Sequence, residues 1–322
     1  MKLRLYFFAF FAAGFAASSV FCMNTGNKVF SVNLEDTFIE ENNNFANKIE
    51  FHDPDKETFY YELKKDGNTQ GGLKGEILFD TLYIKYLVVG EKYRGKVGGL
   101  GAYIMKRALD YSKRRKLRFA FLETFSFQAV GFYKKLGFEA EFIRSGLKGR
   151  KGNIAFHHLI NRDCGFEYDL SEKTKTIEEN NFSLLDVQDA KKQEILEAYM
   201  KQEFDKHYVT VGQSKRIVVP FSISLEDENK EMAGIAKGKF YYDGLRLQEL
   251  IVNSGSLEKQ KELLNKVVDF AKSKKLGLIY FDTLNENSAK FYAANGFEIS
   301  YMRDGYKDGV KHYYMAKYLK NN

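Results

Sequence analysis

The sequence predicts two α+β domains in tandem, each a mixed, mostly antiparallel sheet flanked by helices. Two observations lead to this fold class. The chain has 322 residues, which is long for one ordinary domain and about right for two. In addition, residues 121–139 recur at 280–298, with Gly137 and Gly296 at the same place in each copy, 159 positions apart. A repeat this long indicates two copies of a whole domain.

The composition is that of a globular protein that forms a hydrophobic core. Hydrophobic residues make up 44% and charged residues 29% of the chain, which excludes disordered and collagen-like classes. The net charge of +7 is spread along the sequence, so no nucleic-acid partner is expected, whereas a small anionic ligand remains possible. Cys22 and Cys164 cannot build a disulfide framework, and the five histidines lack metal-ligand spacing, so no metal is expected.

Residues 1–23 form a segment of their own. Lys2 and Arg4 precede an apolar run that ends in small residues near Cys22, a pattern typical of a secretory signal peptide. The run is also nearly long enough to cross a bilayer, so an uncleaved signal anchor is the main alternative. We expect a secreted or exported protein, held at a membrane only if this segment is retained.

The first domain, residues 24–162, begins with strands and a central helix. Strands are expected at 59–63 and 75–79, around a turn signal. The run 82–89 is apolar on both faces, as in a central strand. An apolar stripe then predicts a helix from about 102, whose basic end at 113–116 suits the negative helix terminus.

The remaining elements of this domain follow in the order strand, helix, strand, strand. We expect a strand at 117–122 and a short helix at 128–135 that Gly137 ends. Strands at 138–143 and 154–160 complete the sheet. Residues 163–180 are polar and are expected to form a linker. The second domain, residues 181–322, repeats this order after an amphipathic helix over 187–204.

A glycine-rich turn, Tyr93–Gly101, separates the central strand from the central helix. Its glycines let the backbone approach a ligand, and the helix N-terminus offers free N–H groups to an anion. Arg94 and Lys96 add positive charge suited to a pyrophosphate. The alternative is a plain connection whose basic residues face water. The glycine spacing matches neither a nucleoside-triphosphate loop nor a dinucleotide fingerprint.

This turn and the later segment Thr124–Phe138 resemble the GCN5-related N-acetyltransferase (GNAT) superfamily. That family has an R/Q-x-x-G-x-G/A loop at this place, followed later by a helix ending in a tyrosine and a Gly-Phe pair. The resemblance covers residues 59–160 well and 221–318 more loosely. It implies an acyl-CoA-dependent N-acyltransferase, with acetyl-CoA as co-substrate and an amine of unknown size as acceptor.

The resemblance also implies site residues. Tyr133 matches the tyrosine that returns a proton to the leaving thiolate, although it could equally be a packed aromatic residue. Glu123 is a candidate base, acting directly or through water, and Ser126 either binds coenzyme or caps the following helix. Lys85 stands where related sequences often carry a carboxylate. The expected coenzyme contacts are Leu87, Val89, Arg94, Gly95, Lys96, Gly98, Gly99, Gly101 and Ser126.

Both copies depart from the family's loop. In the first, Val97 and Gly98 are inserted, or else Val97 replaces the first glycine. In the second, residues 253–262 hold one glycine, no arginine and two glutamates. We therefore expect the first domain to be the catalyst and the second a degenerate copy. The alternatives are a non-catalytic interaction protein built on the duplicated fold, and a stabilising second domain beside a weakly active first.

The expected co-substrate and the expected location conflict, because acetyl-CoA is cytosolic whereas the signal directs the chain outward. Two hypotheses reconcile them. The protein is exported into the cytosol of another cell, or an anchor keeps the domains inside. The two basic residues before the apolar run favour a cytosolic N-terminus, which would place anchored domains outside.

Overall fold

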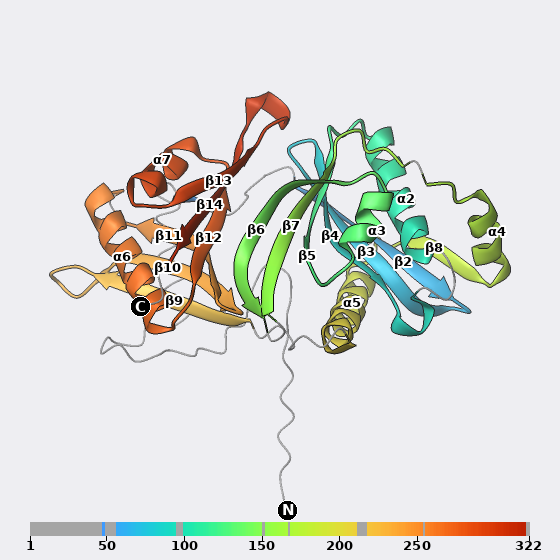
Figure 1. Cartoon of the computed structure of the whole chain (residues 1–322), viewed down its shortest axis with the longest axis horizontal. Coiled ribbons are helices and arrows are strands. Elements are labelled where there is room, and N and C mark those ends of the chain that lie inside the picture. Colours follow the sequence, from blue (N-terminus) through green and yellow to red (C-terminus); the bar gives the residue numbers. More distant parts are fainter. Residues whose placement is uncertain are drawn as a thin grey trace, which may run out of the picture.

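The computed structural model describes residues 47–48, 56–94, 99–149, 152–166, 168–210, 218–253 and 255–319. It contains two seven-stranded mixed sheets with helices packed against them (Figure 1). The α+β class expected from the sequence is thereby confirmed. The expected signal segment, residues 1–23, lies outside the described residues.

The first sheet has the strand order β6-β7-β5-β4-β3-β2-β8. Only the neighbouring strands β4 and β5 run parallel. Its strands are β2 (Glu57–Lys65), β3 (Asn68–Leu78), β4 (Thr81–Val89), β5 (Ala120–Phe125), β6 (Glu139–Gly149), β7 (Gly152–Asn161) and β8 (Phe182–Asp186). The turn between β2 and β3 consists of Asp66 and Gly67, both with positive φ, which is the two-residue hairpin geometry that matches strand twist.

Helices cover this sheet and pack against its strands to form the first core. They are α2 (Leu100–Arg114), α3 (Val130–Lys135), α4 (Ser171–Glu179) and α5 (Ala190–Thr210), with a short 3₁₀ turn, η2 (Glu91–Tyr93). The apolar stripe predicted for α2 is buried: Ile104, Met105 and Ala108 are fully enclosed against the sheet. Central-helix packing therefore follows from the sequence pattern.

Residues 163–210 fold onto the first sheet, although the sequence suggested a linker and the start of the second domain. Ile177 of α4 is fully buried in the first core. Strand β8 pairs antiparallel with β2. Helix α5 packs on β3 and β4, where Leu196 and Met200 join Tyr60 and Val88. These contacts join segments more than 100 residues apart, which local sequence patterns do not encode.

The second sheet has the strand order β13-β14-β12-β11-β10-β9, with β1 paired to β11. Apart from β1, this order repeats that of the first sheet without β8, and again only the two central strands, β11 and β12, are parallel. Its elements are β1 (Asn47–Lys48), β9 (Val219–Glu226), β10 (Met232–Tyr241), β11 (Gly244–Val252), α6 (Leu257–Ser273), β12 (Leu278–Thr283), α7 (Glu286–Ala294), β13 (Glu298–Arg303), η3 (Lys307–Gly309) and β14 (His312–Tyr318).

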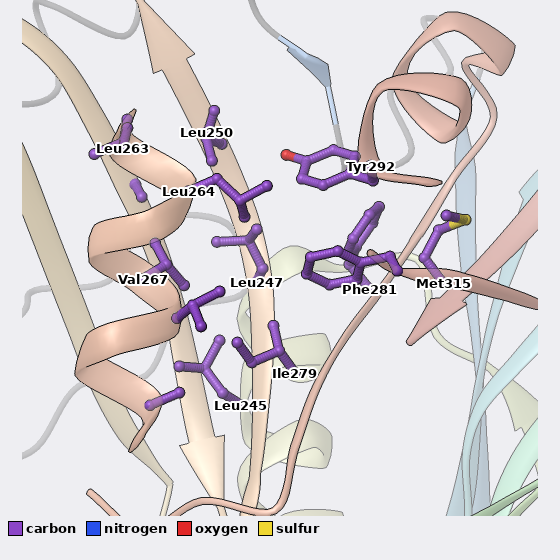
Figure 2. Packing of buried hydrophobic residues seen from close by; sticks show 14 of the residues in the cluster. Leu245, Leu247, Leu250, Leu263, Leu264, Val267, Ile279, Phe281, Tyr292 and Met315 are labelled. Atoms are coloured by element: carbon purple, nitrogen blue, oxygen red, sulfur yellow. The ribbon is translucent and has the colours of Figure 1, made fainter. Parts of the chain in front are cut away.

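The second core lies between this sheet and α6. Figure 2 shows Leu264 and Val267 of the helix facing Leu245 and Leu247 of β11, with Phe281 of β12 beside them. Each of the five side chains is at most 2% exposed. The i, i+3 stripe of α6 thus packs on alternate residues of a strand, as the two periodicities require.

Corresponding positions in the two sheets share unusual backbone conformations. Gly137 and Gly296 end their helices with φ of 83° and 82°, and Lys116 and Lys275 both have φ of 56°. A lysine rarely adopts this left-handed conformation. The same local turn is therefore built twice, at positions 159 residues apart.

The two sheets contact each other through reciprocal pairs. The guanidinium of Arg144 lies 4.6 Å from the ring centroid of Tyr280, and that of Arg303 lies 4.2 Å from the ring of Phe121. Arg144 and Arg303 are counterparts, as are Phe121 and Tyr280, because the members of each pair are 159 positions apart. In a two-fold symmetric interface, if one residue contacts the counterpart of a second residue, then the second residue also contacts the counterpart of the first. The two arginine–aromatic contacts follow this pattern.

A buried ion pair crosses the same interface. Nε of Arg303 lies 2.6 Å from Oε2 of Glu141, with side chains 0% and 2% exposed. Beside it Phe142 stacks on its counterpart Tyr301, with ring centroids 5.7 Å apart. Figure 1 shows β6 and β7 of the first sheet next to the strands of the second. The interface is thus as dry as a domain core and contains paired charge.

We expect Glu141→Gln to destabilise the protein strongly, by about 3 kcal/mol, because it leaves the Arg303 guanidinium buried without its counter-charge. Urea unfolding followed by circular dichroism measures the effect. The exposed pair Glu286–Lys290 is the matched control, and Glu286→Gln should leave the unfolding midpoint unchanged. Equal midpoints for Glu141→Gln and the unmodified protein would contradict this view of the interface.

Candidate functional site

The two central parallel strands of the first sheet part after a short stretch of pairing. Three residue pairs join β4 to β5, and the last is Ile84 with Leu122. The register against β3 shifts at the next residue of β4, Lys85, which forms a bulge. Beyond Ile84, no described strand pairs with β4 on the β5 side. Leu87 and Val89, two of the residues expected to contact the coenzyme, lie on this free stretch.

Helix α2 begins next to the end of β4. Its N-cap is Gly99, whose φ of 96° is left-handed and favours glycine, and whose carbonyl accepts a hydrogen bond from Tyr103 N at 2.7 Å. No side chain caps this helix, and its first turn carries no acidic residue. The first N–H groups of α2 are therefore suited to an anion. Gly95, Lys96 and Gly98 lie outside the described residues, and their roles stay predictions.

Gly101 is a close-packing position in the first turn of α2. A Cβ atom placed there would lie 3.1 Å from Cζ of Phe132 on α3 and 3.9 Å from Val89. A larger residue would therefore push α3 away from α2. A Cβ on Gly99 would lie 3.2 Å from Cδ of Lys173, at the start of α4. The stem of Lys173 thus passes the α2 N-terminus, and its Nζ donates to the hydroxyl of Tyr168, in a segment that looked like a linker.

Arg94 points to α5. Its Nε donates to the carbonyl of Val89 at 2.7 Å, and its Nη2 donates to the carbonyl of Glu203 at 3.2 Å and lies 3.6 Å from the Glu203 carboxylate. That carboxylate also accepts from Glu91 N at 2.9 Å. Glu203 is 4% exposed; burial raises its pKa, but these bonds and Lys206 outweigh burial and lower it. Arg94 therefore anchors the start of the turn.

Sequence reasoning did not find Glu203. The residue lies 109 positions after Arg94, on a helix expected to belong to the second domain. A single glutamate on an amphipathic helix is ordinarily a solvated residue, so no local signal marked it. Only the packing of α5 on β3 and β4 brings its carboxylate to the turn.

Tyr133 lies on α3 with a half-buried ring. The ring packs edge-on against Phe132 and Phe138, with centroids 5.1 and 6.1 Å away. Burial raises the pKa of its phenol to about 12, and no described residue hydrogen-bonds its hydroxyl. The phenol therefore keeps its proton at neutral pH. Packing and proton donation are both compatible with this placement.

Glu123 lies apart from Tyr133. Strand alternation puts its side chain on the face of β5 that carries Phe121, toward the second sheet, whereas Leu122 faces the core beneath α2. Its Oε1 is 3.1 Å from Nδ1 of His158. Burial raises the pKa of Glu123, but His158 and the nearby Arg246 outweigh it, and the net pKa is lowered. Of the expected coenzyme contacts that the structure describes, Val89 and Gly101 lie close together at the end of β4 and the start of α2, away from this carboxylate.

The counterpart of Glu123 in the second sheet, Asp282, sits in the same buried interface. Its two carboxylate oxygens lie 3.2 Å from Nη2 of Arg246 and 2.9 Å from Nε2 of His312. Nδ1 of His312 is 3.1 Å from the hydroxyl of Tyr306. The two strand-end acids thus lie in one cross-domain network of charges and histidines.

Ser126 is hydrogen-bonded to the neighbouring strand, β7. Its hydroxyl accepts from Ala155 N at 3.2 Å, while its own N–H donates to the Ala155 carbonyl at 2.8 Å. Gln128 folds back to accept from Phe125 N at 2.7 Å. The N-cap of α3 is Ala129, without a side-chain cap. Of the two roles expected for Ser126, helix capping is absent, and coenzyme binding stays a prediction.

The corresponding place in the second sheet is closed to an anion. The N-cap of α6 is Ser256, whose hydroxyl accepts from Lys259 N at 3.3 Å, and Glu258 lies in the first turn. Tyr292, the counterpart of Tyr133, is fully buried. Figure 2 shows its hydroxyl directed toward Leu250 and Leu264, and no described residue hydrogen-bonds it. Burial raises its pKa strongly.

The described residues hold neither a cluster of metal-ligating side chains nor a membrane-spanning helix. No three or more His, Cys, Asp or Glu side chains in the described ranges gather as ligands. None of the described helices is long and apolar enough to cross a membrane.

A family model described as "Acetyltransferase (GNAT) family" matches residues 27–138. This stretch includes β2 to β5, the parting of the central strands, α2 and α3, and it ends at Phe138. The resemblance noted in the sequence is therefore confirmed over this range, about a third of the chain. No curated protein matches the chain.

Several solved structures are similar in part. An acetyltransferase from Bacillus cereus is 23% identical over 42% of this chain and 95% of its own, with a TM-score of 0.32. A putative acetyltransferase from Agrobacterium tumefaciens is 20% identical over 43% and 99%, with a TM-score of 0.36. PaiA N-acetyltransferase from Thermoplasma acidophilum, in complex with coenzyme A, is 16% identical over 33% and 60%, with a TM-score of 0.27. Likenesses this low support no statement about activity or acceptor.

We expect acid to weaken the domain interface between about pH 6.5 and 4. Burial lowers the pKa of His312 to about 4, despite Asp282 beside it, so the folded state resists protonation that the unfolded chain accepts near 6.5. Stability is full above 6.5 and falls as pH drops, by up to about 3 kcal/mol from this group. His158, with its pKa also lowered by burial, acts in the same direction.

Thermal unfolding midpoints at steps from pH 7.5 to 4.5 measure this dependence. His312→Gln should flatten the slope, because it removes the titrating group while keeping a polar side chain. His157→Gln is the control, since His157 is only partly buried and away from this network. An identical slope for His312→Gln and the unmodified protein would contradict the assignment.

Proposed function

We propose that the first domain is an acyl-CoA-dependent N-acetyltransferase that transfers an acetyl group to an amine. The observation that carries the proposal is the family match over residues 27–138, because the matched stretch includes the parted strands and the glycine-capped helix. An exposed strand edge beside an uncapped helix N-terminus suits a ligand with an amide-bearing arm and a pyrophosphate.

Acetyl-CoA would bind along the free stretch of β4. Its pantetheine arm adds to the backbone at Leu87 and Val89, and its phosphates lie at the N-terminus of α2. Arg94 already binds the Val89 carbonyl, so we assign it to holding the turn rather than to the phosphates.

In the reaction the amine nitrogen attacks the thioester carbonyl, and the C–S bond breaks as the new C–N bond forms. The amine loses one proton, and the departing thiolate gains one. Tyr133 is the proposed proton donor, because burial keeps its phenol protonated at neutral pH. Glu123 remains the sequence's prediction for the base. Its pairing with His158 on the opposite face of β5 supports an interface role instead.

We further propose that the two sheets are tandem copies of one domain and that the second is degenerate. The shared strand order, the matching φ values and the reciprocal interface contacts support duplication. The self-capped α6, with Glu258 in its first turn, supports loss of the anion site in the second copy. The acceptor amine is open: a small amine, a peptide and a protein lysine all fit.

A non-catalytic protein on the same fold is the alternative. It is favoured by one observation, the engagement of Arg94 by Glu203, which takes the expected phosphate-binding arginine out of the turn. Coenzyme binding separates the two functions. Calorimetric titration with acetyl-CoA should give one site per chain for the enzyme, and no binding at near-millimolar coenzyme would exclude it.

Gly99→Glu should abolish acetyl-CoA binding. The substitution places a carboxylate at the N-terminus of α2, in a left-handed position that also strains any side chain. Calorimetry measures the loss, expected to exceed about tenfold in dissociation constant. Gly255→Glu is the matched control, since Gly255 precedes α6 with φ of 62° and lies at the turn without an anion site. If both variants bind like the unmodified protein, the placement is wrong.

Tyr133→Phe should lower kcat by about tenfold or more while leaving coenzyme affinity unchanged, because it removes only the proton donor. Release of free thiol from acetyl-CoA in the presence of an amine series measures turnover. Tyr292→Phe is the control in the other copy. It should leave turnover unchanged and be neutral or stabilising, since it removes a buried hydroxyl without a hydrogen bond. Unchanged kcat in Tyr133→Phe would leave packing as the role of this residue.

A further inference from the structure

The second sheet has an added strand at the place where its central strands part. Strands β11 and β12 are joined by three pairs, the last of which is Arg246 with Tyr280. Beyond this point β1 takes the free side of β11 and pairs antiparallel, Asn47 with Leu250 and Lys48 with Glu249. The edge that β12 leaves open is therefore filled by a segment from the start of the same chain.

This place corresponds to the free stretch of β4 in the first sheet. Leu250 pairs with Ala236 of β10 just beyond a bulge, as Leu87 pairs with Leu73 of β3 beyond its own bulge. The two leucines are 163 positions apart, the same offset as the rest of this strand. Thus the same edge is open in one sheet, within the described residues, and occupied by peptide backbone in the other.

The surroundings of the second edge suit a peptide rather than a coenzyme. Leu250, Ile251 and Val252 are 0–3% exposed, so their backbone groups need hydrogen-bond partners that water cannot readily supply. A strand supplies such partners along its whole length. The neighbouring α6 offers nothing to a pyrophosphate, because Ser256 caps it and Glu258 follows.

We propose that the edge of β11 beyond Arg246 is a peptide-binding site, formed by strand addition, and that its occupant is the chain's own β1, Asn47–Lys48. The second domain would then hold a peptide where the first holds coenzyme. The chain passes from β1 in the second sheet to β2 in the first. The pairing therefore also ties the start of the first domain to the second.

Hydrogen–deuterium exchange on the full chain tests this site. The double variant Asn47→Pro, Lys48→Pro removes both N–H donors and prevents pairing. Those amides among residues 249–252 that face β1 should then exchange about tenfold faster or more, as expected when backbone hydrogen bonds are lost, whereas those that face β10 should not change. The double variant Asn47→Ala, Lys48→Ala keeps the backbone and should exchange like the unmodified protein. Residues 86–89 of β4 serve as the internal reference and should not change.

Rescue by an added peptide tests the occupant. A synthetic peptide of residues 43–52 should restore protection at 249–252 in the proline variant, and the same peptide with prolines at 47 and 48 should not. Unchanged exchange in the proline variant would overturn the pairing. Restored protection by coenzyme A in place of the peptide, with a second coenzyme site in calorimetry, would overturn the peptide assignment. Neither result depends on activity of the first domain.

Discussion

In each sheet, the two central strands run parallel for three residue pairs and then separate at a bulge. A buried strand with one unpaired side is costly, because its N–H and C=O groups must find partners away from water. This constraint accounts for the most informative features of the molecule. Among the described residues, β4 has no partner strand on this side, whereas on β11 the edge pairs with β1.

The helix that follows each parted strand decides what the edge can bind. Gly99 begins α2 without a side-chain cap, whereas Ser256 caps α6 with its own hydroxyl. One helix N-terminus therefore keeps its N–H groups for an anion, and the other satisfies one of its own. The two sheets therefore differ in a few residues at this turn, while their strand order and the bulges of their central strands are alike.

The interface between the copies explains why the strand-end acids are not placed for chemistry. Glu123 and Asp282 both face it, each beside a histidine, and Arg303 is buried against Glu141. Burying such charges is favourable only when each is paired. A carboxylate held in this way stabilises the arrangement of the two domains, and its lowered pKa makes it a poor proton acceptor.

The sequence by itself determined the α+β class and the central helices, because periodicity and turn residues are local signals. It did not determine that residues 163–210 belong with the first sheet, that Arg94 turns to Glu203, or that Glu123 faces the other domain. Only the tertiary structure decided these three features, since each depends on contacts between segments far apart in the chain. The face of a strand on which a side chain lies, or the position where a helix packs, determines which residue that side chain contacts.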